Sequence, residues 1–307
     1  MTGASKRLTV FTPTYNRAYC LGRCYESLKR QTSKAFVWLV VDDGSTDGTE
    51  ALVREWMSEG AIEIRYYRQE NQGMHGAHNS AYERIDTELN VCIDSDDYMP
   101  DDAVETILSF WERYGHDGVS GIVGLDSDPE GRIIGTRLPE GVPTSTLFDL
   151  YHRHGVTGDK KLVYRTELTK LYPYPLFDGE KYVGLAYKYF KLDERYELLL
   201  LNEVLCRVEY LPDGSSLNML KQYRTNPKGF AFYRKELMKL RFAKTSFKFR
   251  QAIHFVSSAW LSGNRRFVRE SPCKWLTLIA VPFGALLYAF ILLKTKGVRP
   301  TREVRNA

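Results

Sequence analysis

The sequence predicts an α/β fold with a Rossmann-like, mixed but mainly parallel sheet, followed by a helical C-terminal region. Three observations lead to this prediction. Short apolar runs alternate with amphipathic segments four times between residue 8 and about residue 115. Each apolar run ends in a cluster of polar residues. A stretch without any charged side chain, residues 275–293, lies near the C-terminus.

The four apolar runs are expected to be strands, and the segment after each is expected to be a helix. Runs such as Phe36–Val41 are continuously apolar, which is typical of parallel strands covered on both faces. The expected strands are residues 8–12, 36–41, 62–67 and 89–93, and the expected helices are residues 19–30, 50–57, 73–85 and 103–114. Such a sheet binds its ligand beyond the carboxyl ends of the strands.

Every polar cluster in this half of the chain falls at one of those carboxyl ends. The clusters are Thr12–Arg17, Asp42–Asp47, Gln69–His75 and Asp94–Asp97. We therefore expect them to form one site at one edge of the sheet. The first strand is followed by neither a Gly-x-Gly-x-x-Gly motif nor a P-loop, which argues against a dinucleotide cofactor and against a P-loop ATPase.

The cluster Asp94, Asp96 and Asp97 packs three acids into four positions. Three carboxylates at the end of a buried strand would repel one another unless a cation neutralised them. Mg²⁺ or Mn²⁺ would suit them, because either ion keeps coordination positions open for phosphate oxygens. The alternative is a solvated acidic turn before the helix that starts near Pro100.

Asp42 and Asp43 follow the second strand and offer only hydrogen-bond acceptors. They suit a ribose hydroxyl or the N–H groups of a base. The alternative is a capping cluster for the next helix, centred on Asp47.

Four segments together resemble a known family. Phe11–Arg17, Val40–Thr49, Glu70–Gly73 and Ile93–Asp97 are similar, in order and spacing, to successive signatures of family 2 inverting glycosyltransferases with the GT-A fold. The resemblance covers residues 8 to about 115.

The resemblance implies a role for each matching residue. Asp96 would be the direct metal ligand, Asp94 would meet the ribose or the sugar, and Asp97 would be a further ligand. The residues expected at the nucleotide-sugar, with a UDP-sugar as the first expectation, are Pro13, Tyr15, Arg17, Asp42, Asp43, Asn71, Gln72, Gly73, Asp94 and Ser95. A helix N-terminus near Gly73 would help to hold the diphosphate.

Residues 118–215 are expected to form the acceptor half of the domain, after a nucleotide-sugar half at residues 1–117. The expected elements are a hairpin at residues 121–125 and 132–137, a strand at 161–165, a helix at 181–192 and strands within 197–208. Family members usually carry an acidic signature before this helix, but Lys181 stands where an Asp would be expected. Glu180 is the predicted general base and Asp178 the second candidate. The alternative is that either acid caps the following helix.

The C-terminal third is basic, which favours an anionic phospholipid surface over nucleic acid. We expect a basic, aromatic helical region at residues 216–271 and a membrane-associating segment with a basic tail at 272–307. Residues 275–293 are long enough to span a bilayer, but Pro282 and Gly284 interrupt them and basic residues flank both ends. The prediction is a broken, re-entrant or in-plane helical hairpin, ahead of a single span and of a buried core helix.

The five cysteines are odd in number and lack the spacing of a zinc site, so we expect reduced packing residues. No cleavable signal peptide is evident. These features predict a catalytic domain at the cytoplasmic face of the cell membrane.

The sequence thus predicts a metal-dependent inverting glycosyltransferase. Its donor would be a nucleotide-diphosphate sugar, and its acceptor a hydroxyl of a lipid-linked glycan in the synthesis of a surface polysaccharide or glycolipid. One alternative is a sugar-1-phosphate nucleotidyltransferase, although the Gly-Thr-Arg that such an enzyme carries after its first strand occurs here only at residues 135–137. Another is a non-enzymatic membrane-bound protein that binds sugar nucleotides, for which damaged acids would be expected.

Overall fold

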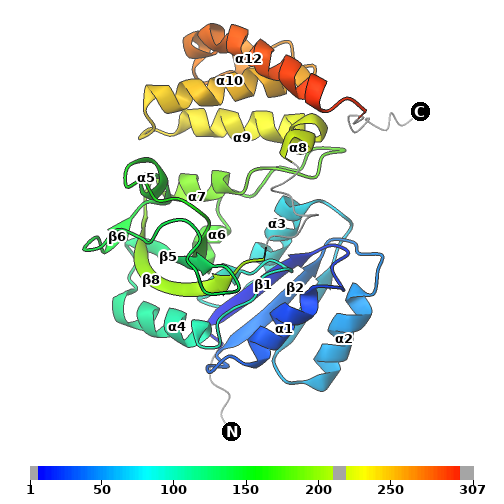
Figure 1. Ribbon diagram of the computed structural model, residues 1–307, viewed down its shortest axis with the longest axis vertical. Coiled ribbons are helices and arrows are strands. Elements are labelled where there is room, and N and C mark those ends of the chain that lie inside the picture. The colour runs from blue at the N-terminus through cyan, green and yellow to red at the C-terminus, as the bar shows by residue number, and fades with distance from the viewer. Residues whose placement is uncertain (1–5, 210–218, 298–307) are drawn as a thin grey trace. The chain divides into compact units, whose positions relative to one another are not determined.

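The computed structural model describes residues 6–209 and 219–297 (Figure 1). The chain forms two compact units that are not consecutive in sequence. The first contains Met1–Pro173 and Arg195–Leu211, and the second contains Tyr174–Glu194 and Pro212–Ala307. The finer division of the chain at residues 117, 215 and 271 stays a prediction.

The first unit is built on one eight-stranded sheet with the order β3-β2-β1-β4-β7-β5-β8-β6. The strands are β1 Leu8–Thr14, β2 Phe36–Asp42, β3 Ile64–Arg68, β4 Leu89–Cys92, β5 Val119–Ser127, β6 Thr144–Ser145, β7 Lys160–Arg165 and β8 Glu197–Arg207. The first four are parallel to one another, and β5 is parallel to β8. β7 is antiparallel to both β4 and β5, and β6 is antiparallel to β8. The predicted mixed, mainly parallel sheet is confirmed.

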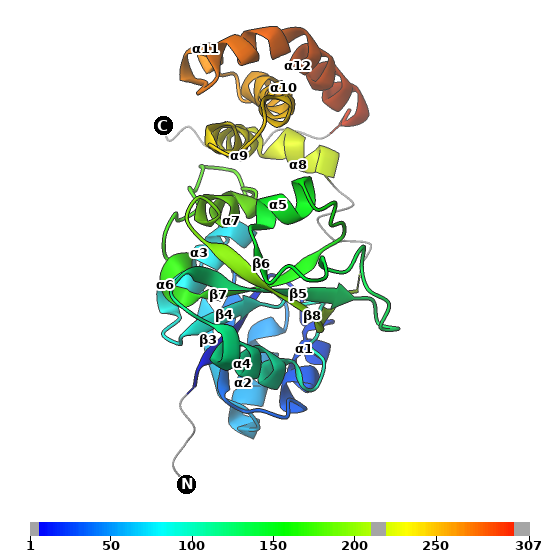
Figure 2. The ribbon, with the colours of Figure 1, turned by 90° about the vertical axis from the view of Figure 1, so that its left-hand side faces the viewer.

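Helices cover both faces of the parallel part of the sheet (Figures 1 and 2). They are α1 Leu21–Lys29, α2 Thr49–Glu59, α3 Met74–Arg84 and α4 Ala103–Tyr114, with the short α5 Leu147–His152 and α6 Thr166–Thr169 elsewhere in this unit. Successive strand residues point to opposite faces. Leu8 and Val10 accordingly join the core formed with α1, α2 and α4, whereas Phe11 packs against His78 and Tyr82 of α3. Double coverage explains the continuously apolar runs.

Two elements predicted within residues 118–215 differ from the structure. Residues 132–137 form no strand, and a single bridge, Ser127 to Ile133, replaces the expected hairpin. Gly135 has a φ of +72° and lies so close to the backbone of Thr157 that a Cβ there would be 2.0 Å from the Thr157 oxygen. A regular strand cannot adopt that conformation. The helix expected at residues 181–192 starts only with α7, Ala186–Leu192.

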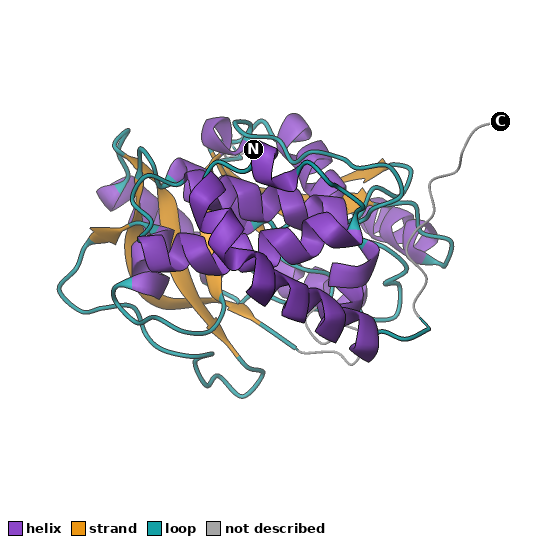
Figure 3. Cartoon of the chain, turned by 90° about the horizontal axis from the view of Figure 1, so that it is seen from above, coloured by secondary structure: helices purple, strands orange, loops and turns teal. Residues whose placement is uncertain are grey.

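The described part of the second unit is helical, with α7 joined by α8 Met219–Thr225, α9 Pro227–Lys239, α10 Thr245–Leu261, α11 Phe267–Glu270 and α12 Lys274–Lys294. Figure 3 shows helices in purple and strands in orange, and every strand belongs to the first unit. A small core joins Met238 of α9, Phe255 and Val256 of α10, and Ala280 of α12. The three long helices therefore pack as one body.

The predicted helical hairpin at residues 275–293 is wrong, because α12 runs unbroken through Pro282. Proline removes one backbone hydrogen bond, but packing of α12 against α10 compensates for that loss. Gly284 permits this packing, since a Cβ at Gly284 would lie 2.5 Å from the Cβ of Val256. Among the described residues, α12 is the one helix long and apolar enough to cross a membrane. Only 22% of its most apolar 18-residue stretch is buried. That low burial also argues against a core helix.

Candidate functional site

The structure brings the predicted nucleotide-binding residues to one edge of the first unit. Thr14 at the end of β1 is level with Asp42 at the end of β2, and Asp42 is level with Arg68 at the end of β3. Ile93, directly after β4, donates its N–H to the carbonyl of Phe11 in β1. The loops that follow these four strands therefore start side by side.

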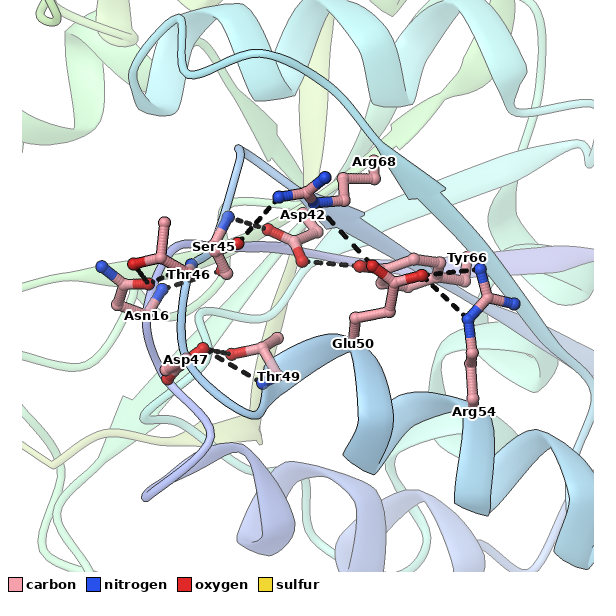
Figure 4. Close-up of polar contacts among 10 residues, drawn as sticks. All are labelled: Asn16, Asp42, Ser45, Thr46, Asp47, Thr49, Glu50, Arg54, Tyr66 and Arg68. Carbon is pink, nitrogen blue, oxygen red and sulfur yellow. Dashed lines mark hydrogen bonds and ion pairs between the residues drawn. The ribbon is translucent and has the colours of Figure 1, made fainter.

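The loops after β1 and β2 are fastened to each other (Figure 4). Asn16 adopts a left-handed conformation with a φ of 54°, which Asn tolerates better than most residues. Its N–H donates to Ser45 Oγ at 2.9 Å, and its side-chain oxygen accepts the N–H of Thr46 at 2.8 Å. Next to this anchored residue in the chain, Tyr15 remains 48% exposed. Tyr15 is thus presented to solvent on a fixed loop, as a residue that stacks on a base would need to be.

Asp42 is completely buried, and both of its carboxylate oxygens accept internal hydrogen bonds. Oδ1 accepts the N–H of Ser45 at 2.7 Å, and Oδ2 accepts the hydroxyl of Tyr66 at 2.6 Å (Figure 4). Burial and the neighbouring carboxylate of Asp42 raise the pKa of Tyr66 above its usual range. Asp42 therefore shapes the loop after β2.

Asp43 fastens the loop after β3 in the same way. Its Oδ1 accepts from the side chain of Gln69 and from the N–H of Gln72, both at 2.8 Å, and its Oδ2 accepts the N–H of Gly73 at 2.8 Å. Gly73 has a φ of +80° and precedes α3. One buried carboxylate thus holds Gln72 and Gly73, two of the three residues predicted to border a diphosphate, just before a helix N-terminus.

Asp47 fulfils the capping role that was the alternative for this cluster. Its Oδ1 accepts the N–H of Thr49 at 3.0 Å and the Thr49 hydroxyl at 2.5 Å (Figure 4). Asp42 accepts instead from Ser45 and Tyr66, and Asp43 accepts from the loop after β3. Asp47 therefore caps α2, whereas Asp42 and Asp43 hold the loops after β2 and β3.

The loop after β4 separates its acids into a pair and a single residue. Asp94 and Asp96 are half-buried, whereas Asp97 is 5% exposed. Asp97 Oδ1 accepts the N–H of Glu209 at 3.3 Å, and its Oδ2 lies 3.7 Å from Cys206 Sγ and 4.0 Å from Lys161 Nζ. Asp97 is therefore engaged by β7 and β8.

Lys161 is a residue that sequence reasoning missed. It lies on β7 between β4 and β5, level with Gly124, and its side chain is only 12% exposed. Burial lowers the pKa of Lys161, but Asp126, Cys206, Asp97 and Asp94 raise it, so the net pKa lies well above the usual value. The ammonium group of Lys161 thus places a positive charge beside the acidic loop after β4.

Asp126, near the end of β5, belongs to the same buried group and was also missed. It is 2% exposed, and burial raises its pKa to about 6 while Lys161 lowers it. Its Oδ1 has no hydrogen-bond partner in the part of the chain that the structure describes, so the ammonium of Lys161 is its main compensation. The signal was present in the sequence, because Asp126 follows an apolar run as Asp42 and Asp94 do.

These contacts alter the prediction that a metal must neutralise Asp94, Asp96 and Asp97 together. Lys161 offsets only part of the charge of Asp97 and Asp126, since burial raises the pKa of Asp97 to about 8 even with Lys161 beside it. The acids left for a metal to neutralise are therefore chiefly Asp94 and Asp96. No three Asp, Glu, His or Cys side chains converge as a metal cage among residues 6–209 and 219–297. Mg²⁺ is commonly bound by one or two carboxylates together with substrate phosphates. The pair Asp94 and Asp96 fits an ion that binds with a diphosphate.

Lys161→Met is expected to lower the free energy of unfolding of the first unit by about 3–5 kcal/mol, the usual cost of leaving a buried charge without its partner. Adding Asp126→Asn should recover part of the loss, because the double variant also removes one of the two buried acids beside Lys161. Urea unfolding of the single and double variants measures this, with the exposed Lys170→Met as control. A single variant as stable as the wild type would show that Lys161 does not compensate these acids.

The two candidate bases lie in the second unit and have different surroundings. Glu180 is 8% exposed, and its carboxylate accepts the N–H of Lys228 at 2.9 Å and the N–H of Gly229 at 2.7 Å. Burial raises its pKa, and these two N–H groups oppose the shift. Asp178 is exposed, and no hydrogen bond to it is found among the described residues.

Glu180 therefore binds the N-terminus of α9, where unpaired N–H groups and the helix dipole favour a carboxylate. Asn226, the N-cap residue of α9, returns the contact by accepting the N–H of Lys181 at 2.7 Å. The helix-capping alternative considered for Glu180 is found, but at α9 and not at the helix that follows it in sequence.

The sequence and fold resemble proteins of known classes. The model of the family described as glycosyl transferase family 2 matches residues 9–171. Glycosyltransferase GlyA of Streptococcus pneumoniae is 34% identical over 41% of this chain and 18% of its own length. The chain thus spans less than a fifth of that relative. The putative teichuronic acid biosynthesis glycosyltransferase TuaG of Bacillus subtilis is 26% identical over 82% of this chain and 96% of its own length.

A solved structure shares the fold across almost the whole chain. S. aureus TarS residues 1–349, in complex with UDP-GlcNAc, superimposes with a TM-score of 0.64 and 17% identity, and the match covers 96% of this chain and 93% of that one. The fold of the chain is accordingly GT-A-like.

Proposed function

Because the chain belongs to glycosyl transferase family 2, we propose that it transfers a sugar, with inversion, from a nucleotide-diphosphate donor to a hydroxyl of a lipid-linked glycan. The product would enter a cell-surface polysaccharide or glycolipid. The observation that carries this proposal is the set of four strand-end loops at one edge of the sheet, of which the loops after β2 and β3 are held by the buried carboxylates of Asp42 and Asp43.

The donor is proposed to be a UDP-sugar. Tyr15 and Pro13 would contact the base, with Arg17 beside them, and the backbone held by Asp42 and Asp43 would accept the nucleoside. The loop from Asn71 to Gly73 would border the diphosphate, where the N-terminus of α3 attracts negative charge. One comparison supports this assignment, because the GT-A-like fold is shared with a protein solved in complex with UDP-GlcNAc.

Asp96 is proposed to bind a divalent metal, with Asp94 and Ser95 beside the ribose and the sugar. The negative charge that grows on the departing diphosphate would be offset by Mg²⁺ or Mn²⁺. Asp97, first expected to be a further ligand, would instead hold the loop through Cys206 and Lys161. Its hydrogen bonds to β8 and the charge of Lys161 support this role.

Asp178 is proposed as the base that takes the proton from the acceptor hydroxyl. The sequence placed Glu180 first and Asp178 second, but both oxygens of Glu180 accept N–H groups of α9. Asp178 is exposed and retains its acceptor capacity. Glu180 would then fix the segment that carries Asp178.

We further propose that the enzyme works at the cytoplasmic face of the cell membrane, where lipid-linked acceptors are found. The apolar, largely exposed helix α12 and the basic residues around it support this location.

Turnover of a panel of nucleotide-sugars, with Mn²⁺ and with chelator, tests the proposed function. We expect one UDP-sugar to release UDP and, because the reaction inverts, a sugar of opposite anomeric configuration seen first by NMR. Retention of configuration would contradict the inverting mechanism. Release of pyrophosphate from a nucleoside triphosphate and a sugar-1-phosphate would instead identify a nucleotidyltransferase, and donor binding without any turnover would favour a non-enzymatic protein.

A further inference from the structure

Helix α12 has two different faces, although almost all of its residues are apolar. The face packed within the second unit is narrow and consists of Thr277, Ala280, Gly284 and Ile291. The opposite face is exposed along the whole helix. We call it the apolar stripe, and its large residues are Trp275, Leu278, Ile279, Phe283, Leu286, Phe290 and Leu293. Trp275 is 81% and Leu286 71% exposed, which is unusual for such residues in a soluble protein.

The packed face joins α12 to α10 at the middle of both helices. Gly284 is the central residue of Lys274–Lys294, and Ile253 is the central residue of Thr245–Leu261. A Cβ at Gly284 would lie 2.5 Å from the Cβ of Val256 and 3.0 Å from the carbonyl oxygen of Ile253. The middle of α10 therefore lies directly against the middle of α12, and the two must be at the same depth in any membrane.

This crossing argues against α12 as a transmembrane span. If α12 crossed a bilayer, its midpoint would lie in the hydrocarbon, and so would the middle of α10. Arg250, which is exposed, and Lys248 lie within two turns of that point. A charged side chain at the centre of a membrane is strongly unfavourable.

The charge of the helical region fits the surface of an anionic membrane. Between residues 219 and 297 there are sixteen Lys and Arg residues and two acids, Glu236 and Glu270. Lys274 and Lys294, both exposed, bound the apolar stripe at its two ends. Each basic residue near an anionic surface strengthens binding to it, and a Trp at the end of the stripe is typical of the membrane interface.

We propose that α12 lies in the plane of an anionic lipid bilayer, with the apolar stripe inserted among the acyl chains and α10 on the aqueous side. The second unit would then be an anchor that enters one leaflet only. This inference sharpens the proposed location at the membrane, but it rests on the packing and charge of the second unit and not on the proposed transfer chemistry. Loss of either would therefore leave the other intact.

Sedimentation of the full chain with vesicles of phosphatidylcholine, with and without phosphatidylglycerol, tests the partner. We expect binding to the anionic vesicles that weakens with added salt. Leu286→Glu should reduce it by roughly tenfold or more, because the variant places a charge where an apolar side chain would enter the acyl chains. Leu293→Glu, at another exposed position of the stripe, should act alike. The control is Leu171→Glu, a 43% exposed residue of the first unit.

Equal binding by Leu286→Glu, Leu293→Glu and the wild type would overturn the proposal. So would a lipid-free dimer, seen by light scattering, that both stripe variants dissociate, because a second copy would then be the occupant of the stripe. Donor hydrolysis by the same variants serves as a separate readout, and we expect it to be unchanged.

The depth of single nitroxide labels separates the in-plane helix from a span. Ile279→Cys, Leu286→Cys and Leu293→Cys place labels on the stripe, about 10 Å apart along the helix axis. An in-plane helix puts all three at one shallow depth, measured by electron paramagnetic resonance against oxygen and a water-soluble quencher. A label at 286 near the bilayer centre, with labels at 279 and 293 toward opposite surfaces, would establish a span and overturn the proposal.

Discussion

Asp96→Asn is expected to lower sugar transfer by roughly a thousandfold or more, since a bound metal contributes several kcal/mol of transition-state stabilisation. The asparagine keeps the shape of the side chain but removes the negative charge that would attract a divalent ion. Asp96 is half-buried in the loop after β4, so the substitution should leave the fold intact. Release of UDP from the preferred donor, at saturating Mn²⁺, measures the effect.

Asp102→Asn is the matched control for this prediction. Asp102 is an exposed acid six positions further along, and its side chain makes no capping hydrogen bond to α4. It should transfer at the wild-type rate. If Asp96→Asn were as active as this control at every Mn²⁺ concentration, the metal role proposed for Asp96 would be wrong.

Asp178→Asn and Glu180→Gln are expected to damage the protein in different ways. Asp178→Asn should lower transfer by about 10²–10⁴-fold, the usual effect of losing a general base, while donor affinity stays the same. Glu180→Gln should lower the free energy of unfolding by about 1–2 kcal/mol, because it weakens charge-assisted hydrogen bonds to the N-terminus of α9. Transfer kinetics, donor binding and urea unfolding of both variants separate these outcomes.

The reverse pattern would restore the assignment made from the sequence. If Glu180→Gln lost transfer at unchanged stability while Asp178→Asn remained active, Glu180 would be the base. The double variant then adds nothing to the single defect in transfer, because only one residue takes the proton.

The fold of the first unit was largely predictable, because its signals are local in sequence. The continuously apolar run at β2 and the mostly apolar runs at β1 and β4 reflect coverage on both faces. The predicted bounds of α4, Ala103–Tyr114, agree with the structure. Where prediction failed, contacts distant in sequence decide the conformation. Gly135 is shaped by Thr157, and the segment after Lys181 stays irregular beside Asn226.

The candidate site residues also differ in how far local sequence predicts them. Asp42, Asp94 and Asp96 stand at the ends of predicted strands, and that position alone makes them candidates for the site. The hydrogen bonds of Asp43 depend on which loop lies beside it, and the place of the Lys161 charge depends on which strands flank β7. The strand β7 lies between β4 and β5 and is antiparallel to both. Sequence patterns contain the residues but not that pairing.

The helix at the C-terminus illustrates a different limit. Pro282 and Gly284 are the residues that suggested a break, yet Gly284 is the point of closest packing of α12 on α10. An interior proline costs about 3 kcal/mol in an isolated helix, and tertiary packing offsets that cost here. Propensity alone therefore gave the wrong conformation at this position.

Calorimetric titration of the wild-type protein with UDP, in Mn²⁺ and in chelator, tests the central claim most directly. If the edge of the sheet holds a nucleoside diphosphate through a metal on Asp96, UDP should bind in Mn²⁺ and lose roughly tenfold or more in affinity with chelator, a difference of about 1.4 kcal/mol. Equal affinity under both conditions would contradict the metal role, and no binding of UDP under either would contradict the proposed donor.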